Sequence, residues 1–348
     1  LTWRANALTS PDTALSGHIL TLTVGTTVLG REPGDKAAGA GAIAVCDATL
    51  SRAHVALVVR PGAETLDVCD LGSRNGTAVG GVAVAHRVEA RAGAVVRAGA
   101  TVLVLDADAG HHAAHGDATG AVPGRSAVAY ALRAALVAAA ADSRPVLIAG
   151  ETGTGKERAA AAVHALSGRS GPLVRLNVAA VPESLFEAEF FGHARGAFSG
   201  AHEARLGRVR EADGGTLVLD EIGELAWPLQ AKLLRLLEDA QLRPLAAKAD
   251  VPVDVKFVAC TNADLAARVR DGSFRQDLAA RLRSHRVQLP PLRLRIADLL
   301  ALADAVAPSA QPWRTRLSAD AVEALALYDW PDNMRELDRV LRSLPTST

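Results

Sequence analysis

The sequence predicts a multidomain protein: an N-terminal all-β sandwich, then an α/β core with a parallel sheet, and finally a C-terminal helical lid. Short β-prone runs divided by Gly, Asn, Asp and Pro fill residues 15–106, as in β-sandwiches. Strand and helix patterns alternate over residues 125–291, which favours a parallel sheet flanked by helices. Residues 292–348 contain only amphipathic helical patterns, and we expect them to pack on the α/β core as a lid.

Composition limits the class of protein. The chain has 348 residues and no net charge, so strong non-specific nucleic-acid binding is not expected. Three widely spaced cysteines show no metal-binding spacing, and no apolar run is long enough to cross a membrane. These features predict a cytoplasmic protein with reduced thiols. The first residue is Leu rather than Met, which predicts a fragment of a longer protein.

Strands of the first domain are predicted where β-prone residues cluster between turn signals. Three of the intervening loops carry polar motifs: Gly30-Arg31, Ser51-Arg52-Ala53-His54 and Asp70 to Thr77. An arginine, a serine hydroxyl and an asparagine amide would suit a phosphorylated peptide, although Asn-Gly-Thr also forms hairpin turns without any ligand. The predicted strands are Ile19–Val24, Ala42–Val45, Val55–Val59, Thr65–Val68 and Val102–Leu105.

In this order, the loop motifs resemble those of forkhead-associated (FHA) domains, which bind phosphothreonine. The resemblance covers residues 15–106 and implies that His54 braces the loops. Residues 34–41 form an insertion that could alter which peptides fit. The phosphopeptide site implied by the resemblance consists of Arg31 and Ser51 on the phosphate, Asn75 on the peptide main chain, and Arg52 and Ser73 at the rim.

Residues 107–124 are rich in Ala, Gly, Asp and His without periodicity, and we expect a flexible linker there. His111, His112 and His115 lack a carboxylate or cysteine at matching spacing, so a solvated tract is favoured over a metal site. After the linker, Ser126 is expected to cap a helix that ends near Ala141.

A phosphate-binding loop is predicted between the apolar strand Val146–Ala149 and a helix that ends near Leu166. Glycines let successive N–H groups point at a polyphosphate, and the lysine reaches its terminal oxygens. Glu157 stands where Ser or Thr usually binds magnesium, and on this loop alone a plain glycine-rich connection stays possible. The predicted ATP-binding residues are Gly150, Glu151, Thr152, Gly153, Thr154, Gly155, Lys156 and Glu157.

A second apolar strand, Thr216–Leu219, is followed by Asp220 and Glu221. Asp220 is placed to hold the magnesium shell, and Glu221 to orient and deprotonate the attacking water. Paired acids could instead cap a helix, but a phosphate-binding loop in the same fold favours catalysis. The other strands expected in this domain are Leu173–Asn177, Val253–Ala259 and His285–Leu289, and the expected lid helices are Ile296–Val306, Ser318–Leu327 and Asn333–Leu344.

Further polar residues follow the strands. Thr261 and Asn262 close an apolar strand, where they could contact a γ-phosphate or the lytic water. Arg275 and Arg281 are six residues apart, and a guanidinium supplied to a neighbouring subunit would stabilise developing charge. Arg335 stands at the start of the last lid helix.

From about residue 122 onward, these motifs resemble the AAA+ domain of sigma-54-dependent transcription activators. The segment Phe190–Ala201 is close to the GAFTGA loop of that family. The resemblance implies that Thr261 and Asn262 act as sensor I, Arg335 as sensor II, and Arg275 and Arg281 as fingers in trans. It also implies that Asn177 restrains the catalytic glutamate. The implied sigma-54 contact is Gly196, Ala197, Phe198, Ser199, Gly200 and Ala201.

The sequence departs from the family pattern at a few positions. Ser199 replaces Thr, which could weaken the sigma-factor contact, and Asp332 replaces Gly, which could shift Arg335. Arg283 replaces Asn after the second finger. The chain stops at Thr348, where family members usually continue into a helix-turn-helix, so DNA is expected to be bound only through a domain not present here.

The resemblance implies an ATPase that uses ATP and Mg²⁺, forms a ring such as a hexamer, and remodels the sigma-54 RNA polymerase holoenzyme. A phosphothreonine-containing protein or peptide bound by the FHA domain would gate this activity. Two alternatives stay open. The chain could be a phosphopeptide-binding scaffold whose AAA+ domain binds nucleotide but hydrolyses it weakly, or an ATPase that acts on another client.

Overall fold

The computed structural model describes residues 2–11, 15–34, 41–108, 120–198, 202–306 and 317–343. The chain divides into two compact units. One contains the N-terminal sandwich, residues 123–131 and the chain from residue 291 onward, and the other contains residues 115–122 and 132–290. The predicted linker histidines and the tip of the insertion after residue 34 lie outside the described residues.

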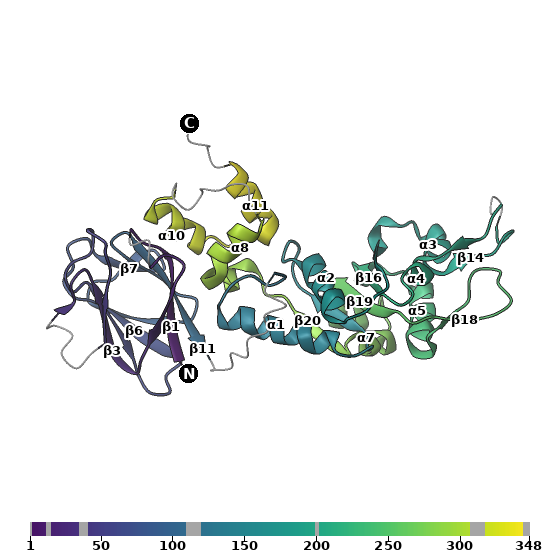
Figure 1. Ribbon diagram of the computed structural model, residues 1–348, viewed down its shortest axis with the longest axis horizontal. Helices are drawn as coiled ribbons and strands as arrows, with labels where there is room; N and C mark the ends of the chain where they lie inside the picture. Colours follow the sequence, from purple (N-terminus) through teal and green to yellow (C-terminus); the bar gives the residue numbers. More distant parts are fainter. Residues whose placement is uncertain are drawn as a thin grey trace. The chain divides into compact units, whose positions relative to one another are not determined.

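The N-terminal sandwich consists of two sheets (Figure 1). Their strand orders are β2-β1-β11-β10-β7-β8 and β4-β3-β5-β6-β9. The first sheet contains β1 (Thr2–Thr9), β2 (Ile19–Leu22), β7 (Thr77–Val79), β8 (Val82–Ala83), β10 (Val95–Ala98) and β11 (Thr101–Asp108). The second contains β3 (Gly25–Gly30), β4 (Gly41–Ala44), β5 (Val55–Val59), β6 (Thr65–Asp70) and β9 (Arg87–Arg91).

The predicted start of the sandwich at residue 15 is too late. Strand β1 begins at Thr2 and pairs along its length with β11, and Trp3 is buried in the sandwich core. The sequence also predicted a single strand over Ile19–Val24. In the structure β2 ends at Leu22, and the chain then turns into a separate strand, β3, which begins at Gly25. Gly25 supplies the positive φ that this turn needs, at 110°.

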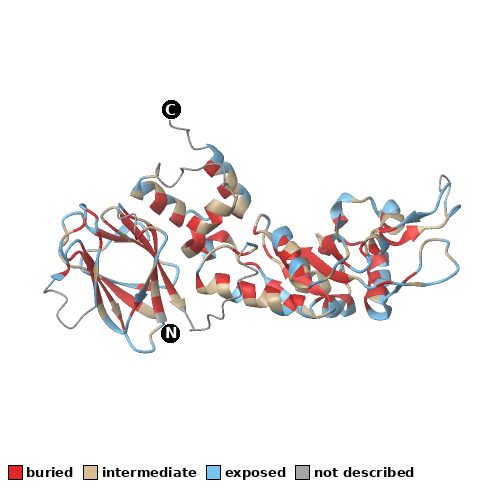
Figure 2. Ribbon diagram, viewed as in Figure 1, coloured by how far each residue is buried: buried red, intermediate tan, exposed pale blue. Residues whose placement is uncertain are grey.

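The C-terminal helices are α8 (Leu299–Val306), α10 (Ala319–Leu327) and α11 (Asn333–Ser343). Ser318 caps α10 by accepting a hydrogen bond from the Ala321 N–H. The apolar faces of these helices form one cluster with residues on the first sheet of the sandwich, and Figure 2 shows buried positions on both. This packing on the sandwich was not predicted from the sequence.

The α/β unit is built on a parallel five-stranded sheet of order β13-β16-β19-β12-β20. Register pairs run from Leu173 with Thr216 to Asn177 with Asp220 between β13 and β16, so the carboxyl ends of these two strands are level. The predicted parallel sheet is thus confirmed. Its strands are β12 (Val146–Ala149), β13 (Leu173–Asn177), β16 (Thr216–Asp220), β19 (Lys256–Thr261) and β20 (His285–Gln288).

Helices surround this sheet. Its main apolar core combines phenylalanines of α3 with leucines of α5 and α7 and with residues of β16 and β19. Ser126 caps α1 through its hydroxyl, which accepts a hydrogen bond from the Ala129 N–H, as predicted. The helices are α1 (Ala127–Ala140), α2 (Lys156–Leu166), α3 (Glu183–Phe191), α4 (Arg208–Glu211), α5 (Trp227–Asp239), α6 (Leu265–Arg270) and α7 (Gln276–Leu282).

Two short antiparallel hairpins extend the α/β unit. One pairs β14 (Gly192–His193) with β15 (Arg205–Leu206), and the other pairs β17 (Gln241–Leu242) with β18 (Val251–Pro252). Backbone hydrogen bonds from Ala194 N–H to Leu245 and from Leu245 N–H to Gly192 join the two hairpins. No helix in the described ranges is both long and apolar enough to cross a membrane.

Candidate functional site

The phosphate-binding loop has the backbone shape that its glycines allow. Gly153 and Gly155 both take left-handed conformations, with φ of 78° and 96°, and α2 begins directly after them. Lys156 is buried, and its Nζ donates to the carbonyl oxygens of Gly150 at 3.0 Å and Glu151 at 3.2 Å. The ammonium group therefore lies over the loop that the sequence predicts for phosphate binding.

Polar residues at the ends of the neighbouring strands lie along the same sheet edge. Asn177 and Asp220 are register partners at the ends of β13 and β16. Thr261 pairs with Ala149 across β19 and β12, and the Gly150 N–H donates to its carbonyl at 3.1 Å. The sheet thus places the phosphate-binding loop beside the ends of β16, which carries the predicted acids, and β19, which carries the predicted sensor residues. Proteins with α/β folds commonly bind ligands at this edge of the sheet.

Glu221 sits in an unusual backbone conformation immediately after β16. Its φ is 53°, in the left-handed region that non-glycine residues rarely adopt, and its N–H donates to Asp220 Oδ1 at 3.1 Å. Strained residues of this kind concentrate at functional sites. The strain turns the chain at the point where the sequence places the general base.

The pKa of the Cys260 thiol responds to the charged groups at this edge of the sheet. Burial is the main reason that the pKa of its thiol rises to about 12. The carboxylates of Asp220 and Glu221 raise it further, while Lys156 opposes them. Cys260 is therefore an inert thiol within the field of the acids and the lysine of the predicted site.

The predicted sensor I residues also lie beside the loop. Asn262 Nδ2 donates to Thr152 Oγ1 at 3.3 Å, and the buried Thr261 hydroxyl accepts a hydrogen bond from the Ala263 N–H at 3.0 Å. A cavity of about 300 Å³ opens beside them, lined in part by Gly150 and Arg283. Arg283, which departs from the family pattern, therefore lines a cavity that borders the phosphate-binding loop.

The residues at this edge suit a nucleotide with magnesium. Mg²⁺ is ordinarily held by one or two carboxylates together with phosphate oxygens and water. Asp220 and Glu221 supply such oxygens beside a loop with a buried ammonium group. The described residues contain no cluster of three or more His, Cys, Asp or Glu that could hold a metal by itself.

The two predicted fingers lie at opposite ends of α7, and both are held by α5. The Arg275 guanidinium forms two hydrogen bonds with Asp277, at 3.0 and 2.7 Å, which raise its pKa, and it lies 5.9 Å from the Trp227 ring centroid. Arg281 lies at the other end and donates to the Leu237 carbonyl at 2.9 Å. Both guanidiniums therefore have defined positions on one short helix.

Gln230 is a positioning residue that sequence reasoning missed. Its side chain is completely buried, with Nε2 donating to the carbonyls of Leu225 and Ser273 and Oε1 accepting from the Arg275 N–H at 2.8 Å. It thereby fixes the start of α7, where Arg275 lies. The available signal was a glutamine on the leucine-rich face of an otherwise amphipathic helix.

Arg335 lies exposed on lid helix α11, within the other compact unit. The effect of Asp332 on the position of Arg335 stays a prediction. The left-handed residues of this turn are Trp330 and Asn333, with φ of 51° and 54°, and not Asp332. Asn333 is buried, and its Oδ1 accepts a hydrogen bond from the Leu292 N–H at 2.7 Å, which fastens the turn.

Phe198 extends from the β14–β15 hairpin and is 46% exposed. Its ring lies 5.0 Å from the ring of His193. At the base of the hairpin, the backbones of Gly192 and Gly207 are in close contact. A Cβ on Gly207 would lie only 2.3 Å from the Gly192 nitrogen. Gly196 and Ala197 precede Phe198 in the described chain, whereas Ser199, Gly200 and Ala201 lie outside the described residues.

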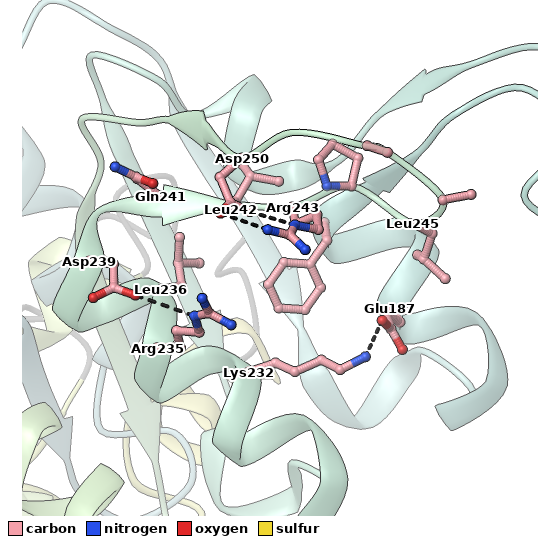
Figure 3. Close-up of a pocket in the computed structure, with 14 residues that line it drawn as sticks. Glu187, Lys232, Arg235, Leu236, Asp239, Gln241, Leu242, Arg243, Leu245 and Asp250 are labelled. Carbon is pink, nitrogen blue, oxygen red and sulfur yellow. Dashed lines mark hydrogen bonds and ion pairs between the residues drawn. The ribbon is translucent and has the colours of Figure 1, made fainter.

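A cavity of about 370 Å³ lies beside the base of this hairpin, between α3, α5 and the β17–β18 hairpin (Figure 3). Buried apolar residues such as Phe191 and Leu242 line it. Three ion pairs surround it, between Lys232 and Glu187, Arg235 and Asp239, and Arg243 and Asp250.

The FHA loops carry the predicted phosphopeptide residues. The Arg31 N–H donates to the Ser51 carbonyl, so these two loops are joined. Ser51 Oγ accepts a hydrogen bond from the Arg74 N–H at 3.0 Å, and Asn75 Nδ2 donates to the Thr49 carbonyl at 2.6 Å. Arg31, Arg52 and Asn75 are exposed, as a peptide ligand would require.

The His54 side chain forms hydrogen bonds with two of these loops. It is completely buried, its Nδ1 accepts a hydrogen bond from the Ser51 N–H at 3.1 Å, and its Nε2 lies 2.9 Å from the Gly76 carbonyl oxygen. An acceptor at Nδ1 requires the proton at Nε2, which then donates to Gly76. Ser73 is held separately, since its hydroxyl donates to Asp70 Oδ2 at 2.6 Å.

The chain therefore combines an α/β domain, which carries a glycine-rich loop between β12 and α2, with a two-sheet sandwich, and family models match both. Residues 122–288 match the model of the sigma-54 interaction domain, and residues 27–99 match that of the FHA domain. The chain thus contains a sigma-54 interaction domain, preceded by an FHA domain.

Curated relatives support this assignment. The nitric oxide reductase transcription regulator NorR2 of Cupriavidus necator is 47% identical over 234 residues, which cover 66% of this chain and 45% of the relative. The sigma54-dependent transcriptional activator SfnR of Pseudomonas putida is 46% identical over 216 residues, which cover 61% of this chain and 59% of the relative. The chain spans about half the length of the curated relatives it matches.

Among solved structures, NtrX of Brucella abortus is 32% identical to this chain and superposes with a TM-score of 0.57. The match covers 66% of this chain and 52% of NtrX. NtrX has also been solved in complex with ADP and with ATP. The AAA+ fold is therefore shown, while the roles of individual site residues stay predictions.

Proposed function

We propose that this chain is a magnesium-dependent ATPase that acts as a ring of copies and remodels the sigma-54 RNA polymerase holoenzyme. A phosphothreonine peptide bound at the FHA loops would regulate it. The observation that carries the proposal is the pairing of two features in one α/β unit: a polar sheet edge with Lys156, Asp220 and Glu221, and a separate hairpin with the exposed Phe198.

The chain's own residues would divide the reaction as follows. Backbone N–H groups of the phosphate-binding loop and Lys156 would bind and orient the ATP phosphates. Glu221 would accept a proton from the attacking water, and Thr261 and Asn262 would position that water. Asp220 would hold the magnesium ion, which supplies charge neutralisation on the phosphates.

Arg281 and Arg275 would act on ATP bound by a neighbouring copy. A guanidinium is worth most when it is presented in a fixed position to charge that develops in the transition state. The attachment of both ends of α7 to α5 supports such a fixed position. Hydrolysis would then depend on the concentration of the chain, because each site needs a neighbour.

The sigma-54 contact is proposed at Gly196, Ala197 and Phe198, with Ser199, Gly200 and Ala201 completing the loop. An exposed aromatic ring flanked by glycine is suited to a protein contact. Tight backbone packing at Gly192 and Gly207 would pass movements of the core to this loop.

The test combines hydrolysis with trapping. Specific ATPase activity should rise with protein concentration and fall by about 1,000-fold or more in Arg281→Ala, since arginine fingers typically contribute that much. With ADP and a metal fluoride as transition-state analogue, the chain should retain sigma-54, and Phe198→Ala should abolish retention. Leu294→Ala, which removes another exposed apolar side chain, is the matched control. Flat, negligible hydrolysis would instead support the scaffold alternative.

A further inference from the structure

The outer face of the first FHA sheet is apolar, although the outer face of a sandwich is ordinarily polar. On β11, Leu103 and Leu105 belong to the sandwich core, whereas Val102 and Val104 belong to a separate cluster. All four side chains are completely buried. Because alternate residues of a strand face opposite sides, β11 is covered on both faces.

The lid helices supply the cover. Val322 and Ala326 of α10 and Leu299 of α8 lie in the same apolar cluster as Val102 and Val104. Helix α10 contacts β1, β10 and β11, and the turn Ile296–Asp298 contacts β11. The sandwich and the lid therefore share one buried interface within their compact unit.

A charged contact fixes the position of α10 on this face. Arg97 of β10 pairs with Asp320, and its Nε lies 2.8 Å from Glu323 Oε2. The Glu323 side chain is only 10% exposed. A carboxylate with so little access to water is costly unless a cation pairs with it. Arg97 therefore favours the position of α10 in which Glu323 lies beside it.

A second contact joins both parts to the start of α1. Asp106, at the end of β11, accepts a hydrogen bond from the Ala127 N–H at 3.1 Å. Asp298 of the lid accepts from the N–H groups of Arg125 and Ser126, each at 2.9 Å, and from the Ser126 hydroxyl. One helix N-terminus is thus held by a carboxylate from the FHA sheet and by another from the lid.

The peptide loops lead directly to this interface. Two residues after Asn75, the chain enters β7, where Ala78 is the register partner of Arg97 on β10. At the β7–β8 turn, a Cβ on Gly81 would lie 3.2 Å from the Leu327 side chain of α10. Asn75 and the lid are therefore connected through one short strand and its partner.

We propose that the lid docks on the outer face of the FHA sheet through α10, so that phosphothreonine-peptide binding and the nucleotide state of the lid are thermodynamically linked. This linkage rests on the proposed function, which supplies the two ligands, and on the prediction that Arg335 of lid helix α11 contacts the nucleotide. Coupling between two binding sites is reciprocal, so nucleotide changes peptide affinity by the same factor as peptide changes nucleotide affinity. Arg97 and Glu323 are positioning residues in this linkage, since neither is placed in the ligand sites.

Peptide affinity measured with and without nucleotide tests the linkage. The probe is a pool of fluorescein-labelled peptides with a central phosphothreonine and randomised flanks, titrated with the full chain with or without a non-hydrolysable ATP analogue. We expect at least about a five-fold difference in affinity. Arg97→Glu should abolish that difference while peptide still binds, and Arg91→Glu on β9 should preserve it. Persistence of the difference in Arg97→Glu overturns the linkage.

A double-mutant cycle tests the docking without any peptide. Arg97→Glu and Glu323→Arg should each lower the thermal unfolding midpoint, and the exchanged pair should recover part of the loss. Strictly additive effects overturn the docking itself. If no phosphothreonine peptide binds but the cycle shows coupling, the proposed FHA function fails while the docked lid stands, so the two failures are distinguishable.

Discussion

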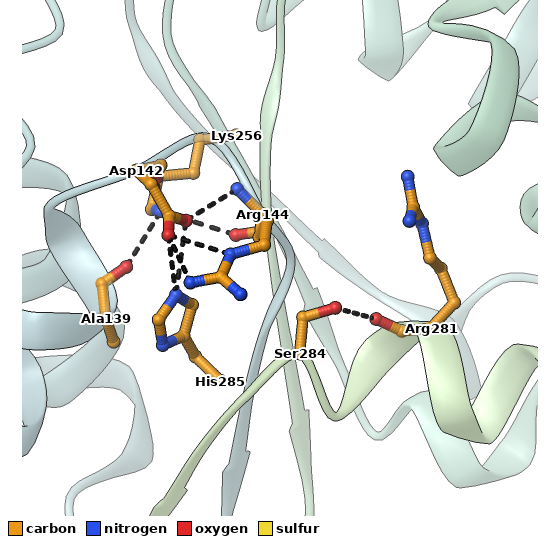
Figure 4. Close-up of polar contacts among 7 residues, drawn as sticks. All are labelled: Ala139, Asp142, Arg144, Lys256, Arg281, Ser284 and His285. Carbon is orange, nitrogen blue, oxygen red and sulfur yellow. Dashed lines mark hydrogen bonds and ion pairs between the residues drawn. The ribbon is translucent and has the colours of Figure 1, made fainter.

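The two edges of the parallel sheet in the α/β unit carry polar residues for different purposes. At the carboxyl edge, Asp220, Glu221 and Asn262 are partly or fully exposed and make few internal contacts. At the amino edge, Lys256 is 1% exposed, and its Nζ donates to the carbonyls of Ala139, Asp142 and Arg144 (Figure 4). One edge leaves groups accessible to a ligand, while the other uses them internally.

The amino edge fastens the end of α1 to the sheet. Helix ends have carbonyl groups without intrahelical partners, and a buried ammonium group on β19 bonds one of them at Ala139. His285, at the start of β20, lies 3.0 Å from Asp142 Oδ2, and Arg144 bonds the same carboxylate (Figure 4). Burial lowers the pKa of Lys256, which shows how far its ammonium group is withdrawn from water.

This difference leads to separable expectations. Changes at the carboxyl edge should remove chemistry and leave the fold intact, because those side chains support little of the packing. Changes at the amino edge should remove stability and leave the chemistry of each folded molecule intact. A variant at the carboxyl edge that lost only stability, or one at the amino edge that lost only activity, would contradict this division.

Glu221→Gln should have the largest effect. Replacing a general base typically costs about 100-fold to 10,000-fold in rate, whereas ATP binding does not need the proton acceptor. Phosphate release and nucleotide affinity measure the two properties separately. The matched control is Glu224→Gln, an exposed glutamate three residues further on, which should keep its activity. Loss of nucleotide affinity in Glu221→Gln would contradict the predicted role.

Lys256→Met should lower stability by about 2 kcal/mol, because carbonyls at the end of α1 lose a buried donor while the aliphatic stem is kept. The decrease is measurable as a lower denaturant midpoint of the α/β unit. ATP hydrolysis per folded molecule should stay within two-fold of the unchanged chain, an estimate for a site distant from the chemistry. Lys248→Met, at an exposed lysine, is the control. A large loss of activity at full folding would place Lys256 in the reaction.

Thr261→Val sharpens the comparison, because Thr261 lies at the carboxyl edge but is buried. Its hydroxyl accepts one backbone hydrogen bond, so we expect a loss of about 1 kcal/mol in stability. Hydrolysis should also fall if the hydroxyl positions water as proposed. Thr216→Val removes another buried hydroxyl, at the start of β16, which lies 2.9 Å from His164 Nδ1, and provides the comparison. Unchanged hydrolysis in Thr261→Val would remove it from the predicted sensor.

Sequence alone predicted the α/β unit well, because its strands are short apolar runs that end in recognisable polar motifs. Strand β12 and strand β13 were predicted at their observed bounds. The prediction Val253–Ala259 began too early for β19, which starts at Lys256. A lysine is an unusual first residue for a buried strand, and only the carbonyls that surround its ammonium group explain its burial.

The packing of the lid on the FHA sheet could not be predicted from helical periodicity, which shows that a face is apolar but not what covers it. One signal was available in Val102-Leu103-Val104-Leu105, where the polar alternation of a one-sided strand is missing. In the same way, Gln230 was missed because two of its three hydrogen bonds reach Ser273 and Arg275, which lie 43 and 45 residues away in the sequence.

Asp142→Asn should have the smallest effect. Hydrogen bonds from Arg144, and then from His285, hold the pKa of this carboxyl well below its usual range. A carboxylate with a lowered folded-state pKa stabilises the fold above its unfolded pKa, and that stability is lost as the pH falls through the folded value. Because the side chain is 36% exposed, we expect only about 0.5 kcal/mol at neutral pH. The difference in unfolding free energy between Asp142→Asn and the unchanged chain should shrink below about pH 4. A gap that widens in acid would mean that Asp142 is protonated in the folded chain.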